Sequence, residues 1–315
     1  MRAHLVQMDL AWERREENIA RAASLLENAG TRRGDLVVLP ELFDSGFSLN
    51  TAVTADAEGR TDAALADLAD RFGVTVQGGR TVRDEGAAKA TNRAPVWAPG
   101  RTKLAEYAKV HPFSFGREPE AFDGGGGDQI QTYDWSDGER SMRVCPAICY
   151  DLRFPELFRV GLTLGAEAYT IGANWPAPRQ SHWRALALAR AIENQAFVFA
   201  VNRCGSDPHL AYSGGTIAVG PKGEVLGELG ELEGVLTVEI DPEDVRRWRA
   251  TFGAWRDLRL LGLEPPQGPL DRPEDRPADG SSDRPSDGAS DGRPSDASAS
   301  VGAANPAQTA RSRSH

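Results

Sequence analysis

Three reactive side chains each follow an apolar segment that has the length and composition of a buried strand. Glu41 follows residues 36–40, Lys109 follows residues 104–108 and Cys149 follows residues 144–148. Sites in α/β proteins often form at strand ends, because the sheet holds the side chains rigidly while the loops leave room for a ligand. Taken singly, such a cysteine is usually a small core residue and such a glutamate a solvated loop residue. Spacing alone also leaves open whether the three side chains meet.

The sequence around each of these residues resembles the nitrilase superfamily of carbon–nitrogen hydrolases. Residues 148–157 (ICYDLRFPEL) resemble the nucleophile motif of that family, residues 39–41 (LPE) its glutamate motif and residues 107–113 (YAKVHPF) its lysine motif. Further similar strings are NWP at 174–176, RAIENQ at 190–195, VNR at 201–203 and YSG at 212–214. The motifs stand in the family's order, and the resemblance covers about residues 3–257.

This resemblance implies a fold and a set of site residues. The fold is an α/β protein, a four-layer αββα sandwich of the nitrilase type, and the site is a triad of glutamate, lysine and cysteine. By position, Glu41, Lys109 and Cys149 take these roles. The family also has a second glutamate a few residues beyond the lysine, for which Glu118 fits best and Glu120 is a nearby competitor. We expect no cofactor, and no metal either, since the five histidines lack paired ligand spacing.

The chemistry of amide hydrolysis gives each of these groups a task. A carboxamide is a poor electrophile, and attack by a thiolate divides its hydrolysis into formation and hydrolysis of a thioester. We expect Glu41 to take the proton of Cys149, deliver it to the departing ammonia and then activate water. Lys109 and the backbone N–H of Tyr150 would stabilise the tetrahedral oxyanion, and Glu118 would position Lys109 or the substrate amide.

Within the family, the strings at residues 149–155, 174–179, 190–195 and 252–257 look most like the omega-amidase branch. That likeness implies an amidase that releases ammonia from monoamides of dicarboxylic or 2-oxo-dicarboxylic acids, such as 2-oxoglutaramate. A substrate with a free carboxylate needs a cation in its pocket, preferably a planar guanidinium that binds both oxygens.

Residues that could bind such a substrate lie close to the motifs. Arg153 and Arg179 are the candidate cations, although Arg153 has an alternative role in an ion pair with Asp151 or Glu156. The aromatic residues that could wall the pocket, or be ordinary core residues, are Phe47, Phe113, Tyr150 and Trp175.

Two other kinds of function remain open. A nitrilase or an N-carbamoyl amidohydrolase would attack a nitrile or a ureido carbon with the same triad. A binding protein could keep this fold without the activity, although all three triad residues are present. The resemblance also implies a homodimer built on helical faces.

The elements that must position these residues alternate along the chain. Helices are predicted over residues 16–29, 62–72, 154–164 and 183–195. Strands are predicted over residues 3–8, 35–40, 74–78, 92–97, 104–110, 142–149, 168–172, 197–201, 214–219, 225–229 and 235–240. Pro146 must lie at a sheet edge or a bulge, because proline lacks an N–H. The predicted strands and helices alternate first, and a strand-rich stretch follows. This order indicates layered sheets with helices outside.

Composition divides the chain into two parts. Its 315 residues permit one or two domains, but no Phe, Trp or Tyr occurs after Trp255. From about Glu264 the chain is almost entirely Asp, Arg, Pro, Gly, Ser and Ala, which cannot bury enough apolar surface to offset its chain entropy. We therefore expect one hydrolase domain over residues 1–263 and a disordered low-complexity tail over 264–315.

Charge and cysteine content restrict partners and location. The net charge of −10 argues against a nucleic-acid partner and against binding to anionic membranes. Three cysteines are too few for a disulfide framework, which favours a reducing cytoplasm. The first residues lack the apolar stretch of a signal peptide, and no apolar run is long enough to span a bilayer. The expected partner is a small amide substrate.

Overall fold

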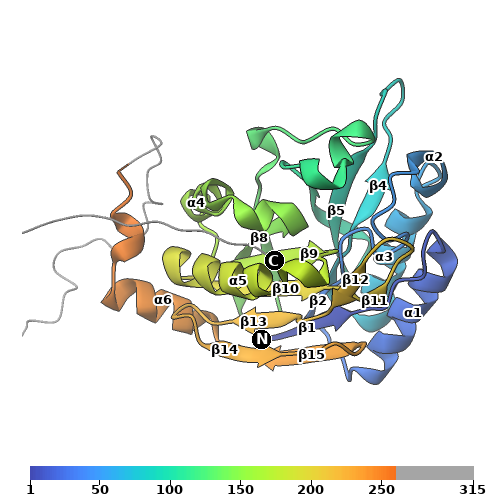
Figure 1. The fold of residues 1–315 in the computed structure, drawn as a ribbon. Coiled ribbons are helices and arrows are strands. Elements are labelled where there is room, and N and C mark those ends of the chain that lie inside the picture. The colour runs from blue at the N-terminus through green and yellow to red at the C-terminus, as the bar shows by residue number, and fades with distance from the viewer. Residues whose placement is uncertain (260–315) are drawn as a thin grey trace, which may run out of the picture. The chain divides into compact units, whose positions relative to one another are not determined.

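The computed structural model describes residues 1–259, which form two β-sheets packed face to face with helices on both outer sides (Figure 1). The first sheet has seven strands in the order β15-β1-β2-β3-β5-β4, with β6 paired to β5. The second has six strands in the order β14-β13-β10-β9-β8-β7, and a separate hairpin joins β11 to β12. This architecture confirms the predicted αββα sandwich.

The bounds of the elements are as follows. The first sheet contains β1 (Arg2–Gln7), β2 (Leu36–Val38), β3 (Thr75–Gln77), β4 (Arg80–Val82), β5 (Thr91–Ala98), β6 (Thr102–Ala108) and β15 (Gly234–Glu239). The second contains β7 (Tyr133–Ser136), β8 (Ser141–Ile148), β9 (Ala168–Ala173), β10 (Phe197–Asn202), β13 (Ile217–Val219) and β14 (Val225–Glu228), and the hairpin is β11 (Cys204–Ser206) and β12 (Ala211–Ser213). The helices are α1 (Arg15–Asn28), α2 (Thr51–Thr54), α3 (Arg60–Phe72), α4 (Pro155–Thr163), α5 (Gln180–Asn194) and α6 (Pro242–Thr251).

The apolar faces of the elements explain the layers. Helices α1 and α3 bury Leu26 and Leu65 in one cluster with Val37 of the first sheet. Helices α4 and α5 bury Leu157 and Ala187 in a second cluster with the strands of the other sheet. A third cluster fills the space between the sheets, and its members include Leu5, Val38, Val144 and Phe199. Each sheet is therefore buried on both faces, as the continuous apolar strand segments predict.

The predicted helices and strands form within a few residues of their predicted ends, and the structure adds short ones. Sequence patterns missed β4, β7, β11, β12, α2 and α6. The start of α6 could have been found from the sequence, because Asp followed by Pro is a common pattern at a helix N-terminus. In the structure Pro242 takes the first helical position, and Asp241 accepts a hydrogen bond from the Glu243 N–H (3.1 Å). The strand predicted from residue 214 begins only at Ile217. Pro146 lies beyond the segment of β8 that pairs with β7, where that side of the strand is unpaired.

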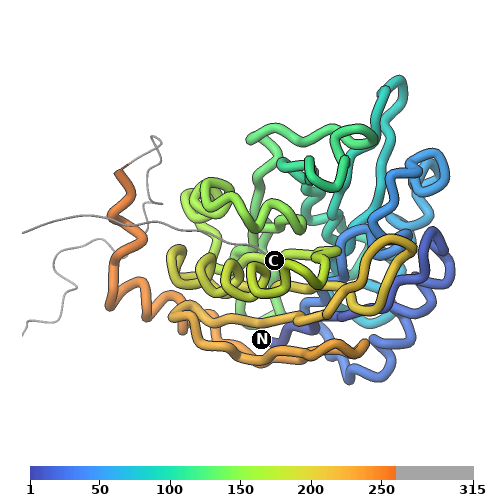
Figure 2. The backbone as a smooth tube through the Cα atoms, viewed as in Figure 1, coloured from blue at the N-terminus to red at the C-terminus, as the bar shows by residue number. Residues whose placement is uncertain are grey.

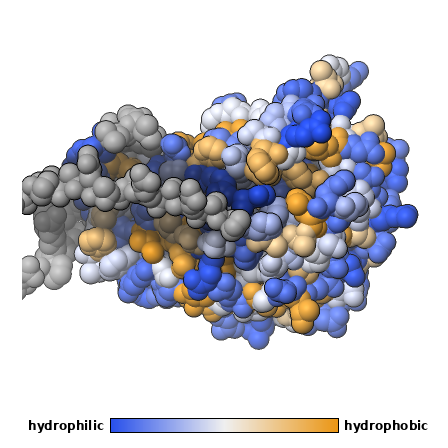
Figure 3. Space-filling view, in the orientation of Figure 1, coloured by the Kyte–Doolittle hydropathy of each residue, from blue (hydrophilic) through white to orange (hydrophobic). Residues whose placement is uncertain are grey.

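Figure 2 shows that segments distant in sequence lie side by side at one end of the sheets, where the β11–β12 hairpin approaches the segment after β1. The Cys204 N–H donates to the Met8 carbonyl oxygen over 2.9 Å, which fixes this approach. On the face shown in Figure 3, apolar side chains are scattered among polar ones. No helix in residues 1–259 is long and apolar enough to cross a membrane. The predicted tail, residues 264–315, lies outside the described residues.

The two sheets approach each other closely beside Glu41. A Cβ atom added to Gly172 of β9 would lie 2.7 Å from the Leu39 carbonyl oxygen and 2.9 Å from the Glu41 nitrogen. Only glycine leaves room for the backbone of the first sheet at this point. The position of Glu41 therefore depends on a glycine in the opposite sheet.

We expect Gly172→Ala to lower the free energy of unfolding by about 1–3 kcal/mol, because the new methyl group forces the backbone atoms apart. Urea denaturation of the full chain measures this difference. Gly127→Ala is the matched control, since a Cβ atom there meets nothing within 4 Å. Equal stabilities of the two variants would contradict the proposed close approach.

Candidate active site

Glu41, Lys109 and Cys149 meet in the structure, at the ends of strands from both sheets. Glu41 follows β2 and Lys109 follows β6 of the first sheet, whereas Cys149 follows β8 of the second. The Lys109 Nζ atom lies 2.7 Å from Glu41 Oε1. The Cys149 thiol is near enough to the Glu41 carboxylate for each group to shift the pKa of the other, and it donates a hydrogen bond to the Asn174 carbonyl oxygen over 3.9 Å. The structure thus brings together the three residues whose meeting the spacing left open.

The second predicted glutamate lies against the same lysine. Glu118 Oε2 and Oε1 lie 2.8 Å and 3.1 Å from Lys109 Nζ, and the Phe113 N–H donates to Glu118 Oε2 over 2.6 Å. Glu120 instead pairs with Arg117 at the surface, where its side chain is 58% exposed. Of the two candidates, Glu118 is therefore the one beside Lys109.

Two asparagines complete the polar contacts: Asn174, which begins the NWP string, and Asn92, which no sequence pattern singled out. Asn92 Nδ2 donates to Glu41 Oε1 (2.8 Å) and to Glu118 Oε1 (3.2 Å), so one amide bridges both carboxylates. The Asn174 N–H donates to Glu41 Oε2 over 2.9 Å, and Asn174 Nδ2 donates to the Glu41 carbonyl oxygen over 2.7 Å. The Glu41 carboxylate is thereby fixed on both oxygens.

Burial and charge set the protonation states. Burial favours the neutral form of Glu41, but the Lys109 ammonium and the Asn174 N–H outweigh it and hold the pKa of Glu41 below its usual value. Burial and the negative charge of Glu41 raise the pKa of Glu118 in spite of Lys109. Burial opposes the charge of Lys109, yet the two carboxylates raise its pKa. The site therefore holds an ionised Glu41 beside a permanently charged lysine.

The Cys149 thiol is protonated in this arrangement. Burial, followed by the negative charge of Glu41, raises the pKa of Cys149 well above its usual value, although Lys109 acts in the opposite direction. The thiol therefore carries a proton that Glu41, the ionised carboxylate near it, is placed to remove.

The turn that carries Cys149 is strained and firmly held. Cys149 has a φ of 46°, in the left-handed region that costs a non-glycine residue about 1–3 kcal/mol. It opens a 3₁₀ turn over Cys149–Arg153. Arg190 of α5 donates through Nη2 to the Leu152 carbonyl oxygen (2.8 Å) and holds the turn from the helix side.

Asp151, which sequence analysis considered only as a partner of Arg153, ties this turn to the segment that carries Lys109. Its Oδ2 accepts hydrogen bonds from the Ile148 N–H (3.0 Å) and the Tyr107 hydroxyl (2.7 Å). Its Oδ1 accepts from the His111 N–H (3.0 Å) and lies 2.8 Å from His111 Nδ1. One fully buried carboxylate thus sets the position of the thiol relative to the lysine.

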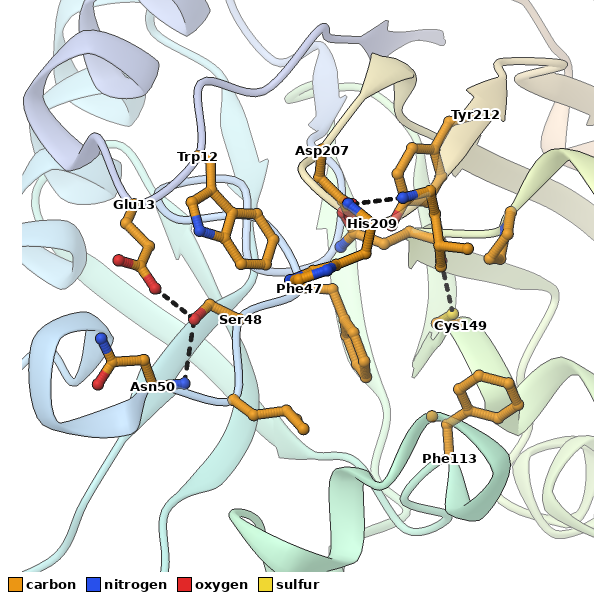
Figure 4. Close-up of a pocket in the computed structure, with 15 residues that line it drawn as sticks. Trp12, Glu13, Phe47, Ser48, Asn50, Phe113, Cys149, Asp207, His209 and Tyr212 are labelled. Carbon is orange, nitrogen blue, oxygen red and sulfur yellow. Dashed lines mark hydrogen bonds between the residues drawn. The ribbon is translucent and has the colours of Figure 1, made fainter.

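Two pockets open on Cys149. The wider one has a volume of about 440 Å³ and is lined by Phe47, Phe113 and other apolar residues (Figure 4). The narrower one, of about 20 Å³, is lined by Tyr150, Arg153, Trp175 and Arg179 as well as Phe113. All the predicted substrate-binding residues therefore line a pocket that reaches the thiol, and the two pockets share Phe113, Asn174 and Pro176.

The two arginines of the narrow pocket have no carboxylate partner within residues 1–259, so the alternative ion pair of Arg153 with Asp151 or Glu156 does not form. The Arg153 guanidinium lies 4.7 Å from the centre of the Trp175 ring and contacts His182 Nδ1 at 3.4 Å. The Arg179 guanidinium lies 5.4 Å from the centre of the Phe113 ring. Both charges are available to an anionic group in the pocket.

Several known proteins are similar to this chain in sequence and in fold. The pattern of the carbon-nitrogen hydrolase family matches residues 2–250. The chain is 35% identical over 256 residues to a 2-oxoglutaramate amidase of Bacillus subtilis, covering 81% of this chain and 96% of that protein. It is 33% identical to the omega-amidase YafV of Escherichia coli, covering 80% of this chain and 94% of that protein. A crystal structure of a CN-hydrolase superfamily protein from Xanthomonas campestris superposes with a TM-score of 0.75 at 33% identity, covering 82% and 97% of the two chains.

Replacement of Asp151 by Asn should lower the free energy of unfolding by about 1–3 kcal/mol. The hydrogen-bond donors around Asp151 are now divided between two carboxylate oxygens, whereas an amide side chain offers them only one oxygen. The rate of Cys149 alkylation by iodoacetamide should change as well, since the turn and the lysine segment lose their common anchor. Urea denaturation and alkylation followed by mass spectrometry measure the two effects. Asp134→Asn, at a side chain 61% exposed, is the control and should change neither. Wild-type values for Asp151→Asn would show that this carboxylate is not the anchor.

Proposed function

This chain belongs to the carbon–nitrogen hydrolase family and is an amidase, and from that premise we propose that it is an omega-amidase acting on monoamides of dicarboxylic or 2-oxo-dicarboxylic acids. Two relatives, a 2-oxoglutaramate amidase and an omega-amidase, support this substrate class by their names. The observation that carries the proposal is the pair of arginines, without carboxylate partners in the described part of the chain, beside the candidate nucleophile.

The carboxylate of the substrate is proposed to bind between Arg153 and Arg179. Burial, together with the charge of Arg179, lowers the pKa of Arg153, which shows that the two guanidinium groups repel each other. An anion placed between them removes this repulsion and gains hydrogen bonds to charged donors. The far carboxylate of an omega-monoamide would then fix the amide carbon at Cys149.

The proposed mechanism uses the four residues that meet at the strand ends. Glu41 removes the proton of the Cys149 thiol as the sulfur attacks the amide carbon, and Lys109 with the Tyr150 N–H stabilises the oxyanion. Glu41 then gives the proton to the departing nitrogen, leaving an acyl thioester on Cys149. A water molecule that loses its proton to Glu41 hydrolyses the thioester. Glu118 positions Lys109 throughout, as its two short contacts with Nζ suggest.

A cytoplasmic location and a homodimer belong to the same proposal. The three cysteines are free and buried, as expected for a protein from a reducing compartment. Apolar side chains are exposed on or beside the outer helices, namely Leu164, Ile192 and Phe252, and these suit a helical dimer face.

Cys149→Ala should abolish the release of ammonia from succinamate, because no other nucleophile is placed at the amide carbon. Cys204→Ala, at a buried thiol away from Lys109 and Glu41, is the matched control and should retain activity. Mass spectrometry of the wild-type chain quenched during turnover should find the acyl group on Cys149. Substantial activity of Cys149→Ala, or an adduct on Cys145 or Cys204, would contradict the assignment of the nucleophile.

Replacing Arg153 or Arg179 by Ala should lower kcat/KM for succinamate about 10- to 100-fold, since a hydrogen bond to a charged group contributes about 1.5–3 kcal/mol. The same variants should hydrolyse butyramide, which lacks the carboxylate, as well as the wild type does. Arg184→Ala removes an exposed arginine that pairs with Glu228 and is the control. An equal loss on both amides would indicate that the arginines hold the fold rather than the substrate.

A further inference from the structure

The wider pocket beside Cys149 is far larger than the release of ammonia requires. It is bounded by the segment after β1, the segment after β2 and the β11–β12 hairpin (Figure 4). Its apolar lining residues are Trp12, Phe47, Leu49, Phe113, Leu210 and Tyr212. Ammonia, like one water molecule, needs only about 10–15 Å³ of such cavity space, whereas this pocket measures about 440 Å³.

The position of Glu41 indicates which part of the substrate faces this pocket. In the proposed mechanism, Glu41 protonates the departing nitrogen, so that nitrogen must lie on the side of the Glu41–Lys109 pair. The wall beside this pair is Phe47, whose ring centre is 5.5 Å from Lys109 Nζ. Phe47 lines the wide pocket and is absent from the narrow one, whereas Arg153 and Arg179 line only the narrow one. The proposed carboxylate site and the side on which the nitrogen departs therefore belong to different pockets.

We propose that the wide pocket binds a substituent on the departing nitrogen, so that the enzyme also hydrolyses secondary amides of dicarboxylic acids that carry an apolar or aromatic group on nitrogen. This inference rests on the proposed function and extends its substrate class. The thiol proton goes through Glu41 to the substituted nitrogen, the C–N bond breaks and the amine leaves. Water then cleaves the thioester, so that one amide and one water give one carboxylic acid and one amine.

The charges at the rim of the wide pocket define the substituent further. Glu13 accepts a hydrogen bond from the Ser48 hydroxyl (2.6 Å), and Asp207 accepts one from the Tyr212 hydroxyl (2.6 Å). Neither carboxylate has a cationic partner within 4 Å among residues 1–259. Two negative charges without an ion pair repel an anionic group, although Arg203 offsets part of the charge of Asp207 from a longer distance. The pocket therefore suits amines that are neutral or positively charged away from the amide nitrogen.

Aromatic side chains form the outer wall. The rings of Trp12 and His209 meet edge to face with their centres 5.7 Å apart (Figure 4). An aromatic substituent that enters the pocket would pack against Trp12 and Phe47, and aromatic contacts add to the gain from burying apolar surface. A benzyl group on the amide nitrogen is thus a suitable probe.

The experiment compares succinamate with N-benzylsuccinamate, and follows the release of ammonia or benzylamine by the full chain. We expect N-benzylsuccinamate to be hydrolysed with a kcat/KM within about tenfold of that for succinamate. N-(4-carboxybenzyl)succinamate, which has the same shape and an added negative charge, should be at least about tenfold worse than the benzyl compound. Trp12→Ala should lower the ratio of the benzyl to the succinamate kcat/KM about tenfold, and Leu232→Ala, at a side chain 84% exposed, should leave that ratio unchanged.

The outcomes separate the two proposals. Hydrolysis of succinamate without release of benzylamine would overturn the inference about the wide pocket and leave the omega-amidase proposal intact. Failure to hydrolyse succinamate at all, while butyramide or a nitrile is hydrolysed, would overturn the omega-amidase proposal. A Trp12→Ala variant that loses both activities in the same proportion would also contradict the inference, because the effect would then not depend on the substituent.

Discussion

One buried ammonium group holds the site together. Lys109 is 1% exposed at its side chain and contacts two carboxylates, Glu41 and Glu118, that are themselves fully buried. Removing a charge from water is costly, and removing one partner of such a pair leaves the other uncompensated. Neither glutamate could stay both buried and ionised without the lysine, and the lysine could not stay buried and charged without them. The position of the candidate base is therefore set by charge as much as by packing.

The sandwich supplies what this charged group requires. Two sheets end at the same side, which brings β2, β6 and β8 to one point although their residues are far apart in sequence. Gly172 lets the two sheets close on Glu41, and Asp151 fixes the thiol turn against the lysine segment. The strain at Cys149 is tolerated because these contacts surround it. The two sheets thus hold the site residues from opposite sides.

The resemblance of the motifs to the carbon–nitrogen hydrolase family predicted the architecture and the three central residues, whereas the continuous apolar segments by themselves predicted only the strands that precede these residues. It could not choose between Glu118 and Glu120, since both lie in a short polar segment and only burial separates them. Asn92 lies 51 residues from Glu41 and has no local signal, so only the pairing of β5 brings it to the carboxylate. The outer wall of the wide pocket could not be predicted for the same reason, because Trp12 and His209 belong to segments that are far apart in sequence and meet only in the folded chain.

We infer that ionised Glu41 keeps the proton on Cys149 until a substrate arrives, and the proposed mechanism depends on this. Burial and the charge of Glu41 raise the pKa of Cys149, so neutralising that glutamate must lower it. The direct measurement is the pH dependence of Cys149 alkylation by iodoacetamide in Glu41→Gln, with the exposed Glu120→Gln as control. We expect the midpoint to move down by about one pH unit or more in Glu41→Gln, about 1.4 kcal/mol per unit, and to stay in place in Glu120→Gln. A midpoint in Glu41→Gln that is unchanged or higher would contradict it.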